Sequence, residues 1–254
     1  MTSPTDRDRG APWRSLLRFA LILLIAVGVL IHVFVQVPIP PVIVLMVLMG
    51  VALYLLGRAG RTRTVGVALG GVAALLFTLG NLPFLVEDLG HPDSVLAFVA
   101  SGAGVVGSIT GFVAMLGALL RLGEAPVRPL FGLATLAVLV VIGVGLVSRL
   151  GVDSDKAEVG DVTLVAKDAD YFPEGTNPDR EEDVEITVER GGAVFVDNKD
   201  LYRHTFTIEN AGIDQEVPAG VDKRIGIDLE RGEYEFICDV EGHEDDMKGT
   251  LTVR

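Results

Sequence analysis

The first 150 residues contain five long apolar runs separated by short polar segments. Each run has close to the ~20 residues that a helix needs to cross ~30 Å of lipid hydrocarbon. We therefore predict five transmembrane helices, at residues 16–35, 42–57, 65–86, 95–120 and 130–148. Residues 1–15, which precede these runs, are mostly polar and are predicted to form a tail.

The charges between the apolar runs predict how this bundle is oriented. Arginines lie between the second and third runs and between the fourth and fifth: Arg58, Arg61, Arg63, Arg121 and Arg128. Acidic residues lie between the third and fourth runs: Glu87, Asp88 and Asp93. Because basic loops remain on the cytoplasmic side, we expect a cytoplasmic tail and place everything after residue 148 outside the cytoplasm. A re-entrant second run would leave four spans and a cytoplasmic C-terminal part, which the arginine pattern disfavours.

Small residues recur at every fourth position in two of the runs. They are Gly66, Gly70 and Ala74 in the third run, and Ala103, Gly107 and Gly111 in the fourth. This spacing lets helices approach closely in lipid. It predicts close packing within the bundle or a homo-oligomeric seam between two copies of the chain. The cores of runs two to five contain no charged residue, so the sequence indicates no conduction path.

Charge divides the chain into two unlike parts. Residues 1–150 carry a formal charge of +4 and residues 151–254 carry −17, although the whole chain is 50% hydrophobic. The absence of a basic patch argues against nucleic acid as a partner. The dispersed acids of the second part favour adaptation to high salt, as in a halophile. The acids around His243 (Glu241, Glu244, Asp245 and Asp246) alternatively form a docking surface for a basic redox partner.

After a predicted linker at residues 149–160, the apolar pattern changes to a period of two. Short strands are predicted at residues 162–166, 184–188, 193–197, 204–208, 223–229, 234–238 and 250–253. Short strands at this spacing, with turn residues between them, predict an all-β sandwich over residues 161–254. Residues 167–182 have little periodicity and are expected to form a loop.

One short segment between the last two predicted strands holds a candidate metal-binding set. It contains the only cysteine of the chain, Cys238, followed by His243 and Met247. A thiolate, an imidazole and a thioether are the soft ligands that copper prefers. His204, the other histidine of this part, begins a predicted strand and supplies the second imidazole of a mononuclear blue-copper centre. Zinc is disfavoured because its sites do not use thioethers.

Residues 159–254 resemble the cupredoxin family, the plastocyanin- and azurin-like copper proteins. The resemblance rests on Cys238, on the pair Gly242-His243, and on the segment from Met247 to Val253. It implies a Greek-key sandwich with one type 1 copper centre, whose ligands are His204, Cys238, His243 and, as the weak axial ligand, Met247. It also implies that electrons pass through the ring edge of His243.

Two further residues are candidates for hydrogen bonds that orient the ligands and tune the reduction potential, Asn198 and Thr205. Thr205 stands where cupredoxins often have asparagine, so the resemblance leaves this bond open. The other two histidines, His32 and His91, could belong to a copper relay. No spacing motif links them, and one interfacial and one loop histidine is the simpler interpretation.

The predicted function is that of a membrane-anchored electron carrier and not of an enzyme. Reduction of oxygen or nitrite would need further copper centres with more histidines than this part contains. The carrier would exchange electrons with membrane redox complexes, for example between a quinol-oxidising complex and a terminal oxidase. Two alternatives stay open: copper capture, delivery or sensing with the same site, and a cupredoxin that serves only as an interaction module.

Overall fold

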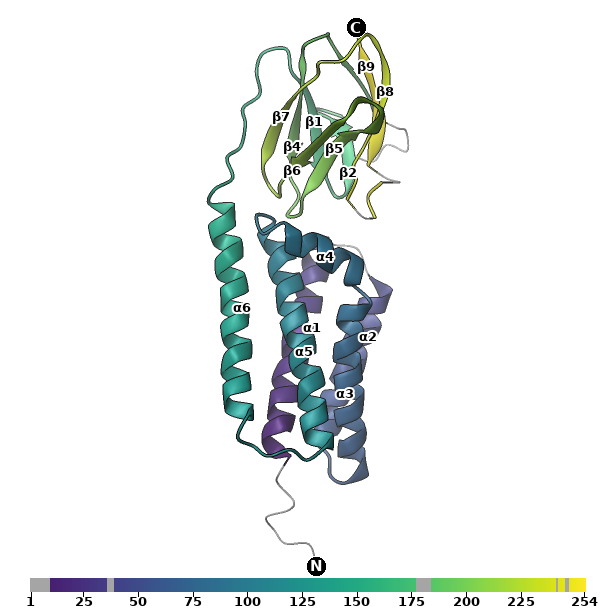
Figure 1. Cartoon of the computed structure of the whole chain (residues 1–254). Coiled ribbons are helices and arrows are strands. Elements are labelled where there is room, and N and C mark those ends of the chain that lie inside the picture. Colours follow the sequence, from purple (N-terminus) through teal and green to yellow (C-terminus); the bar gives the residue numbers. More distant parts are fainter. Residues whose placement is uncertain (1–9, 36–38, 177–183, 241, 245–246) are drawn as a thin grey trace, which may run out of the picture. The chain divides into compact units, whose positions relative to one another are not determined.

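The computed structural model describes residues 10–35, 39–176, 184–240, 242–244 and 247–254 (Figure 1). The chain forms two compact units, a helical one that holds most of residues 1–145 and a β unit that includes Leu146–Arg254. The helical unit contains the predicted membrane part, and the β unit contains the candidate metal centre.

Six helices occur among the described residues: α1 (Ala11–Val35), α2 (Pro40–Leu56), α3 (Arg61–Leu79), α4 (Leu82–Gly90), α5 (Val95–Leu119) and α6 (Val127–Arg149). Four of them, α1, α3, α5 and α6, are long and apolar enough to cross a membrane. The apolar helix α2 is shorter, with 17 residues. The predicted class, an apolar helical bundle followed by a β-sandwich, is therefore confirmed, whereas the five crossings stay a prediction.

The prediction of one continuous third helix over residues 65–86 is wrong at its end. The helix α3 ends at Leu79, and α4 begins at Leu82. Pro83 explains the break, because it has no N–H to donate to the carbonyl of residue 79 and its ring clashes with that carbonyl. The side-chain amide of Asn81 donates to the carbonyl of Phe77 at 2.6 Å and so satisfies one of the last carbonyls of α3.

Glycines let the helices of the bundle approach one another. A Cβ atom at Gly111 would lie 2.8 Å from that of Ala74, and one at Gly70 would lie 2.9 Å from the side chain of Leu21. The small-residue faces predicted from the sequence therefore serve packing inside the bundle. A seam between two copies stays a prediction.

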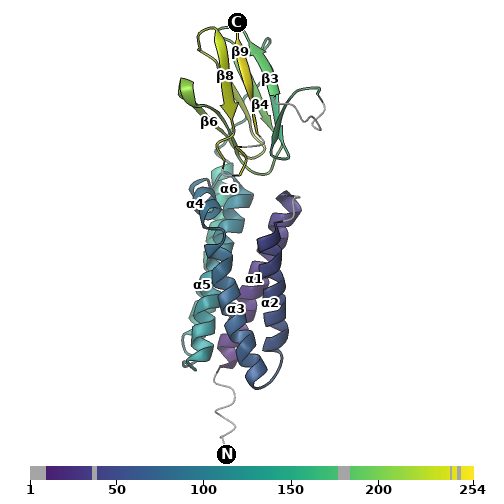
Figure 2. The same cartoon turned by 90° about the vertical axis from the view of Figure 1, so that its right-hand side faces the viewer.

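The β unit is a sandwich of two sheets (Figures 1 and 2). Its strands are β1 (Val162–Lys167), β2 (Asp170–Pro173), β3 (Val184–Val188), β4 (Ala193–Asn198), β5 (His204–Ile208), β6 (Ile213–Val217), β7 (Asp222–Gly226), β8 (Gly232–Ile237) and β9 (Lys248–Val253). One sheet has the order β2-β1-β4-β7, and the other has β3-β9-β8-β5-β6. All seven predicted strands are present, and β2 and β6 were not predicted.

Alternating side chains of both sheets fill the core between them. Leu164, Phe206, Phe236 and Leu251 are fully buried there, as the period of two predicts. The rings of Phe206 and Phe236 stack with their centroids 5.0 Å apart. This aromatic packing lies on the strands that also carry the candidate ligands, so it fixes β5 and β8 relative to each other.

The loop predicted at residues 167–182 begins instead as a tight hairpin. Lys167 pairs with Asp170, which leaves Asp168 and Ala169 as a two-residue turn between β1 and β2. Both turn residues have a φ of 58°. Two-residue hairpin turns of this kind need positive φ at both positions, a conformation that residues other than glycine adopt at some cost. The missing glycine explains why the sequence did not reveal this hairpin.

The second half of the predicted linker lies along β7. The N–H of Asp155 donates to the carbonyl of Asp222 at 3.0 Å, and the N–H of Arg224 donates to the Asp155 carboxylate at 3.0 Å. The Arg224 guanidinium also donates two hydrogen bonds to Asp161, at 2.8 and 2.9 Å. Residues from 155 onward are thus bound to the sandwich, and the stretch left without such bonds is shorter than the sequence indicated.

Candidate metal centre

The four predicted ligands come from two adjacent strands and the segment that joins β8 to β9. His204 is the first residue of β5, and Cys238 follows the last residue of β8. These strands pair with each other at Thr207 and Ile237. His243 and Met247 lie on the segment between β8 and β9. The sheet therefore holds one imidazole and the thiol, and the connecting segment supplies the second imidazole.

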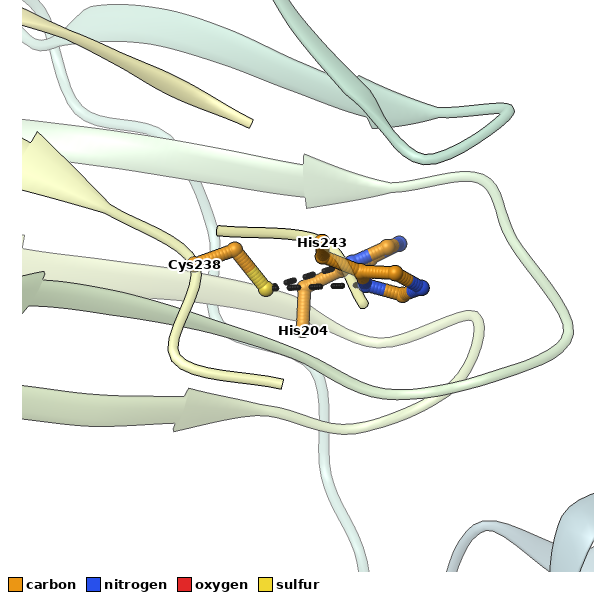
Figure 3. Close-up of side chains that lie close together, drawn as sticks. All are labelled: His204, Cys238 and His243. Atoms are coloured by element: carbon orange, nitrogen blue, oxygen red, sulfur yellow. Dashed lines mark hydrogen bonds between the residues drawn. The ribbon is translucent and has the colours of Figure 1, made fainter. Parts of the chain in front are cut away.

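Three of these side chains converge on one point. One nitrogen of His204, one of His243 and the sulfur of Cys238 all lie within 4.8 Å of one another. The Cys238 Sγ atom is 3.7 Å from Nδ1 of His204 and 3.8 Å from Nδ1 of His243 (Figure 3). Among the described residues, this is the one group of three or more histidine, cysteine and acidic side chains that could hold a metal ion.

The spacing of these three atoms fits a trigonal metal ion. Metal–sulfur and metal–nitrogen bonds of about 2.3 and 2.0 Å, at an angle of about 120°, separate the two ligand atoms by about 3.7 Å. Both sulfur–nitrogen distances, 3.7 and 3.8 Å, agree with this value. Two imidazoles and one thiolate in a plane are the donor set of blue-copper sites. The donor types and both sulfur–nitrogen distances therefore fit a copper ion.

Backbone hydrogen bonds place Met247 beside the other ligands. Its N–H donates to the carbonyl of His243 at 2.8 Å, and its carbonyl accepts the N–H of Cys238 at 2.8 Å. Its side chain is fully buried in the same core cluster as Cys238. The axial role that the sequence assigns to Met247 stays a prediction.

Thr205, which stands where cupredoxins often have asparagine, contacts both Cys238 and the residue after it. Its N–H points at the Cys238 sulfur at 3.4 Å. Its hydroxyl oxygen accepts the N–H of Asp239 at 2.7 Å. A threonine hydroxyl thus holds the backbone immediately after the cysteine, which a side-chain oxygen of asparagine could equally do.

Asn198 holds the segment that leads to His204. Its side-chain nitrogen donates to the carbonyls of Tyr202, Val217 and Pro218, each at 3.0 Å. Its side-chain oxygen accepts the N–H of Asp200 at 2.9 Å. Asn198 therefore acts on the ligands through the backbone of this segment and contacts none of the three converging atoms.

Sequence reasoning missed two residues of this segment, Asp200 and Tyr202. The Asp200 carboxylate lies 2.8 Å from Nε2 of His204. The Tyr202 ring lies against both imidazoles, with centroids 5.1 Å from His204 and 5.5 Å from His243. An aspartate four residues before a strand histidine is too common a pattern to indicate this contact. Only the bend of the chain between β4 and β5 brings the two side chains together.

Burial favours the neutral forms of Cys238 and His243 when no metal is bound. Burial raises the pKa of the Cys238 thiol. Burial, together with the nearby His204, lowers the pKa of His243 to about 4. Because copper binds cysteine as a thiolate, metal binding should release the proton of Cys238 at neutral pH. His204 is fully buried and His243 is half-buried.

The two histidines of the helical unit are engaged by backbone groups. Nδ1 of His32 lies 2.7 Å from the carbonyl of Gly28, and its Nε2 accepts the N–H of Ile39 at 3.2 Å. Nδ1 of His91 lies 2.8 Å from the carbonyl of Glu87. These contacts agree with the structural interpretation of both residues. Of the acids around His243, Glu244 is exposed, and Glu241, Asp245 and Asp246 lie outside the described residues.

Comparison with known proteins identifies a family for the C-terminal part of the chain. Residues 135–253, a range that begins inside α6, match the family described as the cupredoxin-like domain. No curated protein matches the chain. The C-terminal part of this protein is a two-sheet β domain with a His-Cys-His cluster. That part is a cupredoxin-like domain.

Solved structures with a similar fold include forms of amicyanin and a chain of a terminal oxidase. A Cu(I) form of an amicyanin mutant is 17% identical, with a TM-score of 0.31, over 41% of this chain and 90% of that chain. A reduced form of another amicyanin mutant is 18% identical, with a TM-score of 0.30, over 39% and 87%. A chain from the cryo-EM structure of a heme-copper terminal oxidase dimer is 16% identical, with a TM-score of 0.28, over 49% and 97%.

Proposed function

We propose that this protein is a membrane-anchored type 1 copper protein that carries single electrons between membrane redox partners on the extracytoplasmic side. The observation that carries the proposal is the convergence of His204, Cys238 and His243 at the spacing of a trigonal copper site. The cupredoxin-like domain supports a copper-binding electron-transfer role in general. The single centre, its axial Met247 and the membrane partners are the finer parts of the proposal.

Copper would supply a one-electron couple, in which one electron enters from a reduced donor and leaves to an oxidised acceptor. The chain supplies a fixed set of donors that suits both oxidation states, so little rearrangement accompanies the transfer. Cys238 and His204 are fully buried, which keeps water from the sulfur. His243 is half-buried, so its ring lies nearest to a docked partner and is our proposed route for the electron.

Contacts at the helix ends support five crossings. Trp13 Nε1, near the start of α1, donates to the carbonyls of Leu122 and Gly123, which follow α5. Arg18, also near the start of α1, donates to the carbonyl of Leu56 at the end of α2. At the other end of α1, His32 binds the N–H of Ile39 just before α2. The helix α2 therefore runs the length of the bundle, and its 17 residues span about 26 Å.

These contacts also gather the arginines at one end of the bundle, which supports an extracytoplasmic sandwich. The starts of α1, α3 and α6 and the ends of α2 and α5 carry Arg14, Arg18, Arg58, Arg61, Arg63, Arg121 and Arg128. A basic end is retained on the cytoplasmic side. We accordingly assign residues 1–15 to a cytoplasmic tail, 16–148 to the membrane, 149–160 to a linker and 161–254 to the exported domain.

The full chain, purified and loaded with copper, tests the copper centre. We expect one copper ion per chain, an intense blue absorption and a reversible one-electron reduction, all of which disappear in Cys238→Ser. Tight Cu(I) binding without colour would instead indicate copper capture or delivery. A chain that binds no metal would leave only a role as an interaction module. Either of these results would contradict electron transfer.

The lysines offer a separate test of sidedness. All five lysines of the chain lie after residue 150, so an amine reagent that cannot cross membranes reports the side on which the sandwich lies. Added to intact cells, such a reagent should label the lysines and leave the N-terminal amine unmodified. Unmodified lysines would place the copper domain in the cytoplasm, whether the N-terminal amine is labelled or, as the four-span alternative predicts, is not.

A further inference from the structure

Asp200 lies behind the proposed copper ligand His204 and contacts it directly. The carboxylate is 7% exposed, and one of its oxygens lies 2.8 Å from Nε2 of His204. Both oxygens of this side chain already accept N–H groups from Asp168 and Ala169, so Asp200 is the acceptor in its contact with His204 and Nε2 is the donor. Nδ1, which faces the Cys238 sulfur, is then left with its lone pair free for a metal ion.

The same carboxylate also binds the turn of the first hairpin. The N–H groups of Asp168 and Ala169 donate to its two oxygens, at 2.9 and 3.3 Å. Both residues have a φ of 58°, in the left-handed region that is unfavourable for a residue with a side chain. Successive N–H groups in such a turn form a concave site for an anion. The strained turn therefore persists because it holds the carboxylate.

The carboxylate is fixed from its backbone side as well. The N–H of Asp200 donates to the side-chain oxygen of Asn198 at 2.9 Å. Asn198 is itself buried and anchored by three carbonyl acceptors. No freedom is left for the Asp200 side chain to turn away from His204 without breaking several buried hydrogen bonds.

We infer that Asp200 is a positioning residue, which fixes the ring of His204 in the metal-binding tautomer and, by its negative charge, lowers the reduction potential of the copper centre. This inference rests on the proposed copper function. Carboxylates that accept the second N–H of a metal-bound histidine orient the ring and increase its basicity. A nearby negative charge stabilises the more positive, oxidised state, so its removal should favour the reduced state.

The potential of Asp200→Asn in the full-length, copper-loaded chain tests the inference. At a fixed solution potential, we expect the ratio of reduced to oxidised copper to rise about tenfold, which equals about 59 mV for a one-electron couple. The matched control is Asp239→Asn. It removes the same charge beside Cys238, but from an exposed side chain, and should change the ratio much less. Asp200→Glu keeps the charge and should restore most of the original ratio.

The outcomes separate this inference from the function on which it rests. If the unaltered chain takes up no blue copper, the proposed function fails. If the unaltered chain and Asp200→Asn are both blue and have equal potentials, the function stands and the role of Asp200 is refuted.

A variant that does not take up copper would require a measurement on the unaltered chain. The chain has four histidines, so the ring N–H signals of the Cu(I) form can be assigned in a histidine-labelled sample. We expect the Nε2 proton of His204 to exchange slowly with water. Exchange as fast as that of an exposed histidine would overturn the inference.

Discussion

The bundle and the sandwich each contain histidines, and they use them in opposite ways. In the bundle, both ring nitrogens of His32 contact backbone groups, so the residue closes the connection between α1 and α2. In the sandwich, Nε2 of His204 contacts a side chain, the Asp200 carboxylate, and not a backbone group. The other nitrogen faces a sulfur atom at 3.7 Å.

This difference shows why the count of histidines in the sequence did not locate the chemistry by itself. A histidine whose two nitrogens bind the backbone has no lone pair left for a metal ion. A histidine oriented by a carboxylate has one lone pair free and directed. The hydrogen-bond partners of each ring, and not how deeply the ring is buried, therefore distinguish a structural histidine from a candidate ligand.

The largest expected effect separates His204 from His32. The variant His204→Ala should lower the affinity for copper by more than about 100-fold, because a ligand is lost. The variant His32→Ala should leave copper affinity unchanged. It should cost about 1 kcal/mol of bundle stability, because two partly buried backbone groups lose their partner. Copper titration and thermal denaturation of both variants check the pair. A loss of copper binding in His32→Ala would instead support the hypothesis that His32 belongs to a copper relay.

Each unit contains a glycine on which an aromatic ring packs directly, so each can be destabilised separately. A Cβ atom at Gly117 would overlap the Trp13 ring in the bundle, and one at Gly249 would overlap Phe236 and the carbonyl of Val184 in the sandwich. Overpacking of this kind costs about 1–3 kcal/mol. We expect Gly117→Ala to destabilise only the bundle and Gly249→Ala only the sandwich, because the chain divides into two compact units.

Each unit carries its own probe for this measurement. The only tryptophan, Trp13, reports the unfolding of the bundle by fluorescence, and the blue absorption that we expect of the copper-loaded chain would report the sandwich. Matched controls are Gly143→Ala and Gly226→Ala, where a Cβ atom meets nothing within 4 Å. If Gly117→Ala or Gly249→Ala lowers the unfolding midpoint equally by both probes, the two units unfold together, which would contradict the prediction.

Much of the candidate site could be predicted from the sequence, because its ligands are chemically rare. Cys238 is the only cysteine, and the histidines and methionine near it have no competing copies in that part of the chain. The apolar runs and the period-two strands are equally direct signals, since each reflects a large free energy of burial. These features were sufficient for the class of fold and for the set of three converging side chains.

The remaining features depend on contacts that local sequence does not encode. Asp200 reaches His204 only because the segment after β4 is fixed by Asn198, whose partners include Val217 from another strand. The hairpin turn at Asp168 and Ala169 has no glycine to reveal it, and it depends on the same carboxylate. The break after α3 had a local signal in Pro83, but the apolar run through it outweighed that signal in the prediction.

A smaller effect concerns the ion pairs of Arg224 with Asp161, which directly follows the linker, and with Glu158 of the linker. The guanidinium of Arg224 holds the pKa of Asp161 below its usual value, chiefly through the hydrogen bonds between them. A carboxyl group with a lowered pKa in the folded state stabilises the fold above its ordinary pKa of about 3.9, and this contribution is lost as pH falls through the lowered value. We therefore expect Arg224→Gln to lower the denaturation midpoint of the sandwich at neutral pH.

The pH dependence identifies the cause. The difference between Arg224→Gln and the unaltered chain should be constant above pH about 5 and should vanish in strong acid, when Asp161 is protonated in both. Denaturation followed by the blue absorption, or by circular dichroism where acid releases the metal, gives the two midpoints. A difference that persists at the lowest pH would show that packing of the arginine side chain, and not its charge, binds the linker.

The smallest expected effect concerns Thr205, which touches the sulfur through its backbone and the segment after Cys238 through its side chain. Thr205→Val removes the hydroxyl acceptor of the Asp239 N–H and keeps the N–H that faces the Cys238 sulfur. We expect a loss of about 1 kcal/mol in the stability of the sandwich, with an unchanged blue colour. Thr207→Val is the matched control, because it removes a neighbouring hydroxyl that bonds to Thr205 and leaves the Asp239 contact intact. If Thr205→Val loses the blue colour and Thr207→Val keeps it, the Thr205 hydroxyl also controls the ligand geometry. The positions of His204 and Cys238 would then be less rigid than their buried hydrogen bonds indicate.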